Sequence, residues 1–143
     1  MEMSTAGAGL ITAQLAATVT YADAASGASR LQIYSAMPEG DARAVPAGAL
    51  LVSVILAKPC GTVAGEVLTL TPATLGGNVA LAGGFARWCR WVRTDGALVF
   101  AGNVTDMANG GFFRLAGGYT PDGETSPLLQ AGGLVMFGTM VLG

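Results

Sequence analysis

The chain contains no histidine, so nucleophilic chemistry would need a cysteine or serine activated by a lysine or a carboxylate. Its one lysine, Lys58, lies two residues before Cys60. In an extended segment residues i and i+2 point the same way, so the ammonium and the thiol could meet. A solvated lysine beside a packed thiol at a strand end explains the same residues, and we favour that interpretation. The sequence therefore predicts no catalytic residue and no enzymatic activity.

Asp122 and Glu124 lie in a loop rich in proline and glycine. Carboxylate oxygens suit a hard cation, but two of them are a weak signal, and the composition of the loop is typical of a surface turn. The Gly-Gly pairs lack the lysine and the strand-to-helix setting of a phosphate-binding loop. We therefore expect no metal site and no cofactor.

Three of the seven basic residues, Arg87, Arg90 and Arg93, share one short segment with Trp88 and Trp91. Arginine and tryptophan together could form a stacking platform for nucleic acid. Strand alternation places Arg90 on the face opposite to Arg87 and Arg93, so no face carries more than two of the charges. The net charge of the chain is −2, which also disfavours binding to the phosphate backbone. Core packing with a polar rim, or a protein contact, is the better interpretation, and we expect no nucleic-acid partner.

The same alternation assigns the two tryptophans to opposite faces of the strand. The face with Trp88 and Val92 carries one charge and the face with Trp91 carries two, so we assign the first to the core. The second face is then available to a neighbouring subunit. The candidate protein-contact residues are Arg87, Trp91, Arg93, Phe112 and Phe113.

Charged residues make up only 11% of the chain, against about 25% in an average soluble protein. A folded monomer of this mass exposes roughly 6,800 Å², which leaves about one charge per 425 Å². So bare a surface favours association, and we expect a homo-oligomer, a dimer or larger. The uncharged windows 3–22 and 125–143 are too polar or too interrupted by glycine to span a membrane, so we expect no membrane partner.

The first basic residue is Arg30, whereas a secretory signal begins with a basic segment, so we expect a protein made inside the cell and not exported by that route. Cys60 and Cys89 have neither the spacing of a metal-ligand pair nor the number needed for a disulfide framework. We expect two reduced thiols without a bridging role.

Most of the chain has the pattern of short strands. Residues 8–24 partly fit a helical stripe, and strands are expected from Arg30 to the turn at Met37-Pro38 and over 49–57, 66–71, 79–82 and 134–142. The strand 49–57 should end at Lys58-Pro59, because proline cannot continue a ladder. Asp95-Gly96 predicts a hairpin of 85–93 with 97–105, joined by a two-residue primed turn.

These elements predict an all-β protein: a single-domain β-sandwich, jelly-roll-like, with about eight strands over residues 30–143. Residues 1–29 would form an N-terminal arm or a short helix. The sequence does not order the strands, and immunoglobulin-like and jelly-roll topologies both remain open.

Three segments resemble a known group of proteins: 31–38 (LQIYSAMP), 50–61, and 86–96 (ARWCRWVRTDG) continuing into 101–104 (AGNV). Over residues 30 to 143 the chain is similar to small β-sandwich virion proteins of tailed bacteriophages, closest to the jelly-roll cement, or decoration, proteins of the capsid.

The resemblance implies a structural protein, made in the cytoplasm of a host bacterium and placed on the capsid surface of the virion. It would bind the major capsid protein and its own copies, as a dimer, and stabilise the shell. Two alternatives remain: a component of the tail or of a tail fibre, and a β-sandwich that binds a small ligand or a glycan.

Overall fold

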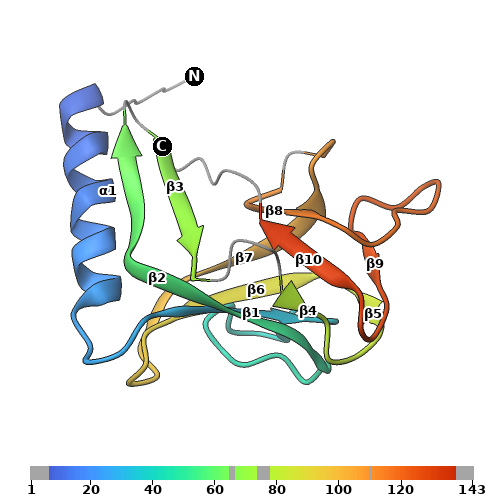
Figure 1. Ribbon diagram of the computed structural model, residues 1–143. Helices are drawn as coiled ribbons and strands as arrows, with labels where there is room; N and C mark the ends of the chain where they lie inside the picture. The colour runs from blue at the N-terminus through green and yellow to red at the C-terminus, as the bar shows by residue number, and fades with distance from the viewer. Residues whose placement is uncertain (1–6, 65–66, 74–77, 110, 138–143) are drawn as a thin grey trace.

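The computed structural model describes residues 7–64, 67–73, 78–109 and 111–137. In these ranges the chain is mostly β-structure with one helix, which confirms the predicted all-β class (Figure 1). The helix is α1 (Ala8–Asp23). The strands are β1 (Arg30–Tyr34), β2 (Leu50–Ala64), β3 (Val67–Pro72), β4 (Asn78–Val79), β5 (Gly84–Phe85), β6 (Trp88–Val92), β7 (Leu98–Asp106), β8 (Phe113–Ala116), β9 (Leu128–Leu129) and β10 (Leu134–Phe137).

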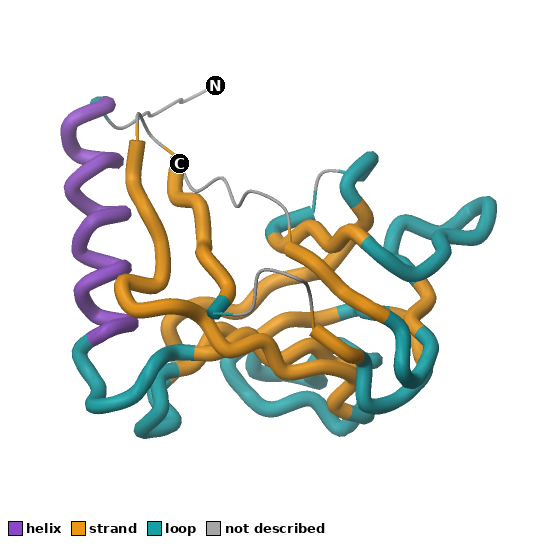
Figure 2. The backbone as a smooth tube through the Cα atoms, viewed as in Figure 1, coloured by secondary structure: helices purple, strands orange, loops and turns teal. Residues whose placement is uncertain are grey.

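Eight strands form one curled, mixed sheet in the order β3-β2-β1-β6-β7-β8-β10-β4, and β5 pairs with β9 in a small second sheet. Neighbouring strands are antiparallel except for the parallel pair β7 and β8. Just after β4, the backbone N–H of Leu81 donates to the carbonyl of Leu51 in β2 at 2.7 Å. This bond brings one end of the strand order back to β2, so the sheet curls over itself (Figure 2).

The core lies on one face of the three neighbouring strands β2, β1 and β6. Leu31 of β1 is the partner of Val54 in β2 and of Trp91 in β6, and all three side chains are buried. The next row across the same face is Ile33 with Val52 and Cys89, also buried. The alternation of apolar and polar residues in 31–34 therefore marks the core face of β1 correctly.

Helix α1 stands beside the distal part of β2 and β3 (Figure 1). Ile11, Leu15, Val19 and Ala22 recur every three or four residues and so share one face of the helix. Leu15 and Ala22 are buried, and Ile11 and Val19 pack against the core. The predicted helical stripe in residues 8–24 is thus a helix that covers part of the core.

Strand β2 is longer than the sequence predicts, because it continues past Lys58-Pro59 to Ala64. The pairing with β3 shifts register between Leu56 and Gly61, so Pro59 lies in an interruption of the ladder, where no N–H is required. The prediction that Pro59 ends the strand was therefore wrong: this proline lies at a bulge.

The hairpin of β6 and β7 is present, but its turn is not the predicted two-residue turn. The N–H of Gly96 donates to the carbonyl of Arg93, the N–H of Arg93 donates to the carbonyl of Ala97, and φ of Gly96 is +91°. These bonds define a three-residue loop with a glycine bulge, and the register shifts between Trp91 and Val92. The carboxylate of Asp95 supports the longer loop by accepting the N–H of Ala97 at 3.1 Å.

The predicted burial of Trp88 and Val92 in β6 is confirmed, but the predicted exposure of Trp91 was wrong. Trp91 is fully buried on the core face, where its indole N–H donates to the hydroxyl of Ser29 at 3.0 Å. Trp88 is also largely buried, on the opposite face of the strand beside Tyr34. The count of charges misled because Arg87 precedes β6 and Arg93 follows it, so neither arginine belongs to the face that the strand buries.

Candidate interaction surface

Exposed apolar side chains gather where β4 pairs with β10. Val79 and Leu134 are register partners in these strands, and they are 53% and 59% exposed. Leu81, two residues after Val79, is 69% exposed. We call Val79, Leu81 and Leu134 the apolar patch. Clustered large apolar side chains at the surface of a soluble protein indicate a contact site, whereas scattered ones do not.

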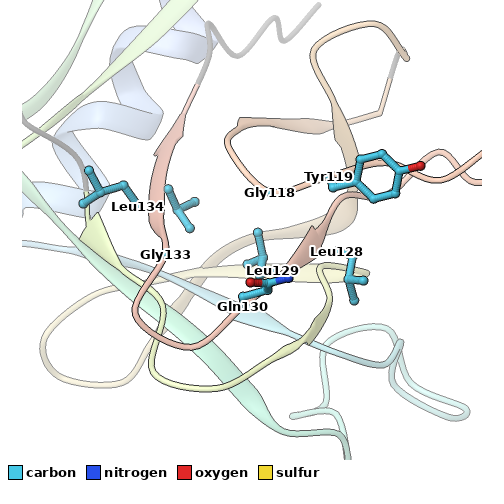
Figure 3. A pocket seen from close by; sticks show the side chains of 8 residues that line it. Gly118, Tyr119, Leu128, Leu129, Gln130, Gly133 and Leu134 are labelled. Atoms are coloured by element: carbon cyan, nitrogen blue, oxygen red, sulfur yellow. The ribbon is translucent and has the colours of Figure 1, made fainter.

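A groove of about 310 Å³ adjoins the apolar patch. Its lining comes from residues 118–119, 128–130 and 133–135, and it contains no acidic or basic residue. Figure 3 shows Leu134 on one side of the groove and Leu128 and Leu129 on another, while the ring of Tyr119 points away from it. The groove and the patch thus form one uncharged surface, which suits an apolar protein partner better than a polar ligand.

Glycines give this surface its shape. The turn before β10 has Gly132 at φ +85°, and its N–H donates to the carbonyl of Ala80, which holds the turn against the end of β4. Gly117 has φ +109°, and a Cβ there would lie 2.5 Å from the carbonyl oxygen of Leu134. The backbone of β10 can therefore approach residue 117 only because that residue is glycine.

Arg87, a predicted contact residue, anchors the loop that leads to the groove. Its guanidinium contacts the carboxylate of Glu124 at 2.8 Å and lies over the ring of Phe85 at 4.5 Å. In the same loop, the hydroxyl of Ser126 donates to the carbonyl of Val104 at 2.8 Å. Glu124 is thus an ion-pair partner of Arg87, and Asp122 is exposed in the adjacent turn.

The other predicted contact residues do not form one exposed surface. The guanidinium of Arg93 contacts Asp95 at 2.7 Å and lies over the ring of Tyr21 in α1. Phe112 is half-buried and packs against Phe113, which is buried. Burial of Trp91 and Phe113 contradicts a contact role for these two, whereas a role for Arg87, Arg93 and Phe112 stays a prediction.

The members of the apolar patch were not among the candidates from the sequence. The signal is weak, because Val79 and Leu134 become neighbours only through the pairing of β4 with β10. The alternation of 134–142 was readable from the sequence, but it did not show which face is covered, and residues 138–142 lie outside the described ranges.

The Cys60 thiol lies in a buried polar cluster at the end of α1. The N–H of Cys60 donates to the carboxylate of Asp23 at 3.0 Å. Burial of the thiol and the nearby negative charge of Asp23 raise the pKa of the Cys60 thiol from 9.0 to about 12. Lys58 is exposed, and its ammonium donates to the carbonyl of Ala25 at 2.7 Å. A raised pKa is the opposite of what an activated nucleophile needs.

This cluster predicts a specific loss of stability in alkali. The raised pKa means that the folded chain holds the Cys60 proton more tightly than the unfolded chain, so its contribution is complete below pH 9. As the pH rises from 9 toward 12, the contribution should fall by about 1.4 kcal/mol per pH unit. We expect denaturant unfolding of the wild type between pH 8 and 11 to show this slope in addition to a similar contribution from the second buried thiol, Cys89.

Cys60→Ala is the control for that slope. It should be less stable than the wild type at pH 8, because it leaves a cavity, but the difference between the two should shrink as the pH rises. Equal slopes in both proteins would contradict the buried Asp23 and Cys60 pair. Cys89 is buried among apolar side chains, which raises the pKa of its thiol as well, so Cys89→Ala should also reduce the alkaline slope by about 1.4 kcal/mol per pH unit.

Comparison of the chain with protein-family models, curated proteins and solved structures finds no match. In the described ranges, no group of three histidine, cysteine, aspartate or glutamate residues could hold a metal ion. Among the same residues, no helix is long and apolar enough to cross a membrane.

Proposed function

We propose that this protein is a structural component of a tailed-phage virion, a capsid cement protein that binds the major capsid protein and stabilises the shell. The observation that carries the proposal is the uncharged surface formed by the apolar patch and its groove. The scarcity of charge along the whole chain and the likeness of residues 30 to 143 to phage virion proteins support it. In this function the protein binds and performs no chemistry.

The fold that belongs to this proposal is a jelly-roll-like β-sandwich. In it, β8, β10 and β4 would form the layer that faces β2, β1 and β6, and the bond from Leu81 to Leu51 supports such a closure. The parallel pairing of β7 with β8 departs from a jelly roll of antiparallel strands. The proposed sandwich is therefore a variant with one parallel pair.

The apolar patch is proposed as the contact with a second copy of the chain. A two-fold contact places the same residues of both copies against one another, so it favours an uncharged patch over a charged one. Val79, Leu81 and Leu134 meet this condition. The dimer would then leave the other faces of each copy free for the capsid shell.

The first alternative, a component of the tail or of a tail fibre, would use the same patch. It differs from the cement-protein function only in where the protein lies in the virion. A glycan-binding module would need exposed aromatic rings beside amides or carboxylates. The sequence offers Trp91, Phe112 and Phe113 for this function, and Trp91 and Phe113 are buried. A glycan-binding module would therefore have to use the exposed Tyr119 and the amide of Gln130, which both line the groove.

Fractionation of virions tests the proposal. Particles of the phage that encodes the chain would be separated into empty heads and tails, and each fraction probed with an antibody to the protein. We expect the protein with the heads, in a constant ratio to the major capsid protein. Its presence only with tails would support the tail alternative, and its absence from both fractions would contradict a virion role.

A further inference from the structure

We propose that a second surface binds carboxylate groups of a partner protein. This surface is a groove on the outer face of the paired strands β1 and β6. Its occupant would be an acidic segment with apolar side chains, held by Arg30 and Arg90. This groove has a volume of about 220 Å³ and is lined by Arg30, Gln32, Arg90, Val92, Arg93, Thr94 and Gly96. The inference relies on the proposed function only for the identity of the partner, which would be the capsid shell.

The strand register places the two arginines beside one another. Arg30 of β1 is the partner of Val92 in β6, and Gln32 is the partner of Arg90. All four side chains lie on the face opposite to the core, because Leu31 and Trp91 point to the other side. Arg30 and Arg90 are thus diagonal neighbours, with Cα atoms about 7 Å apart.

Neither of these two arginines has a carboxylate partner among the described residues. The ion pairs found there use Arg43, Arg87 and Arg93 instead. Arg90 is half-buried, its Nε is buried without an acceptor, and one Nη donates to the carbonyl of Arg43 at a long 3.3 Å. A half-buried cation without a counter-charge is costly, so an anion from outside would be favoured there.

Gln32 adds a donor to the same groove. Its Oε1 accepts the phenolic hydrogen of Tyr34 at 3.3 Å, so its amide N–H₂ remains to donate. The hydroxyl of Thr94 accepts the N–H of Gly27, so its own O–H also remains to donate. The unused polar groups of Arg30, Gln32 and Arg90 are therefore donors, and their complement is an anionic acceptor.

The surroundings of the arginines favour a protein over nucleic acid or free phosphate. Ile55 of β2 is the register partner of Arg30, on the side away from Val92, and is 50% exposed. Arg30 thus lies beside the exposed apolar side chain of Ile55, which has no complement in a phosphate backbone. Two cations on a chain of net charge −2 also give little electrostatic attraction for nucleic acid.

A peptide titration tests the proposal with the purified protein. The probe is the blocked peptide acetyl-Glu-Leu-Asp-Leu-amide, followed through the amide and arginine signals of the protein by NMR at low salt. We expect a dissociation constant in the millimolar range, with shifts centred on β1 and β6. The isosteric peptide acetyl-Gln-Leu-Asn-Leu-amide should bind about tenfold more weakly or not at all.

Variants locate the site. The double variant Arg30→Gln with Arg90→Gln should weaken acidic-peptide binding by about tenfold or more. Arg114→Gln, which removes one positive charge on β8 outside this groove, should leave the binding unchanged. If the double variant is unfolded in a thermal melt, Arg30→Gln alone gives the answer, because Arg30 lies at the start of β1. Equal binding by wild type and variants would overturn the proposal.

Two further probes distinguish a protein carboxylate from a phosphate as the bound anion. Inorganic phosphate or an eight-nucleotide thymidylate that binds as tightly as the acidic peptide would overturn the assignment to a protein carboxylate. Failure of all probes to bind would overturn the site itself. None of these results depends on where the protein lies in a virion. Failure of the groove proposal can therefore be distinguished from failure of the cement-protein proposal.

Discussion

Trp91→Ala is expected to destabilise the fold by about 3 to 5 kcal/mol, because the side chain is fully buried in the core. A domain of this size has a total stability of about 5 to 15 kcal/mol, so the variant should lose much of it. The melting temperature should fall by about 10 °C or more. Thermal and denaturant unfolding, followed by far-ultraviolet circular dichroism, would measure the change.

A matched pair of substitutions isolates the hydrogen bond of Trp91. Trp91→Phe and Trp88→Phe remove the same atoms from two largely buried tryptophans of one strand. The indole N–H of Trp91 donates to Ser29, whereas that of Trp88 is buried without an acceptor among the described residues. We therefore expect Trp91→Phe to be the more destabilising by about 1 to 3 kcal/mol. The opposite order would contradict the core assignment of β6.

The sequence was informative wherever a local pattern decided the structure. Alternation in residues 31–34 predicted the core positions of Leu31 and Ile33, although Tyr34 on the other face is buried too, and Asp95-Gly96 predicted the hairpin. The predicted two-residue turn was wrong, because the side chain of Asp95 stabilises a longer loop that is equally compatible with an Asp-Gly pair.

The candidate surfaces depend on pairings between distant segments, and local patterns do not contain them. Val79 and Leu134 form one patch because β4 pairs with β10, and Arg30 and Arg90 share a groove because β1 pairs with β6. The error about Trp91 has the same origin. Its burial is decided by β1 and by Ser29 across the fold, and not by the charges that flank it in the chain.

The two surfaces suggest a division of roles within the proposed function. The apolar patch carries no charge and would join copies of the chain, whereas the groove of Arg30 and Arg90 offers cations to a different partner. Uncharged surfaces contribute contact area, and charged groups add specificity and a faster encounter. Raising the salt concentration should therefore weaken the second contact and spare the first.

Leu134→Glu should abolish association through the apolar patch. The substitution places a carboxylate at the centre of an uncharged surface, and burying it in a contact without a partner is strongly unfavourable. The fold should tolerate the change, because the side chain is 59% exposed, and substitutions at such positions usually alter stability by about 0.5 kcal/mol or less. Val45→Glu, at a residue of equal exposure in the loop between β1 and β2, is the matched control.

Sedimentation velocity on the wild type, Leu134→Glu and Val45→Glu tests the central claim that the apolar patch is an interface. At tens of micromolar, the wild type and Val45→Glu should sediment with at least twice the chain mass of 14.3 kDa, and Leu134→Glu should sediment as a monomer. A wild-type protein that is a monomer under these conditions, or a Leu134→Glu variant that associates as the wild type does, would contradict it.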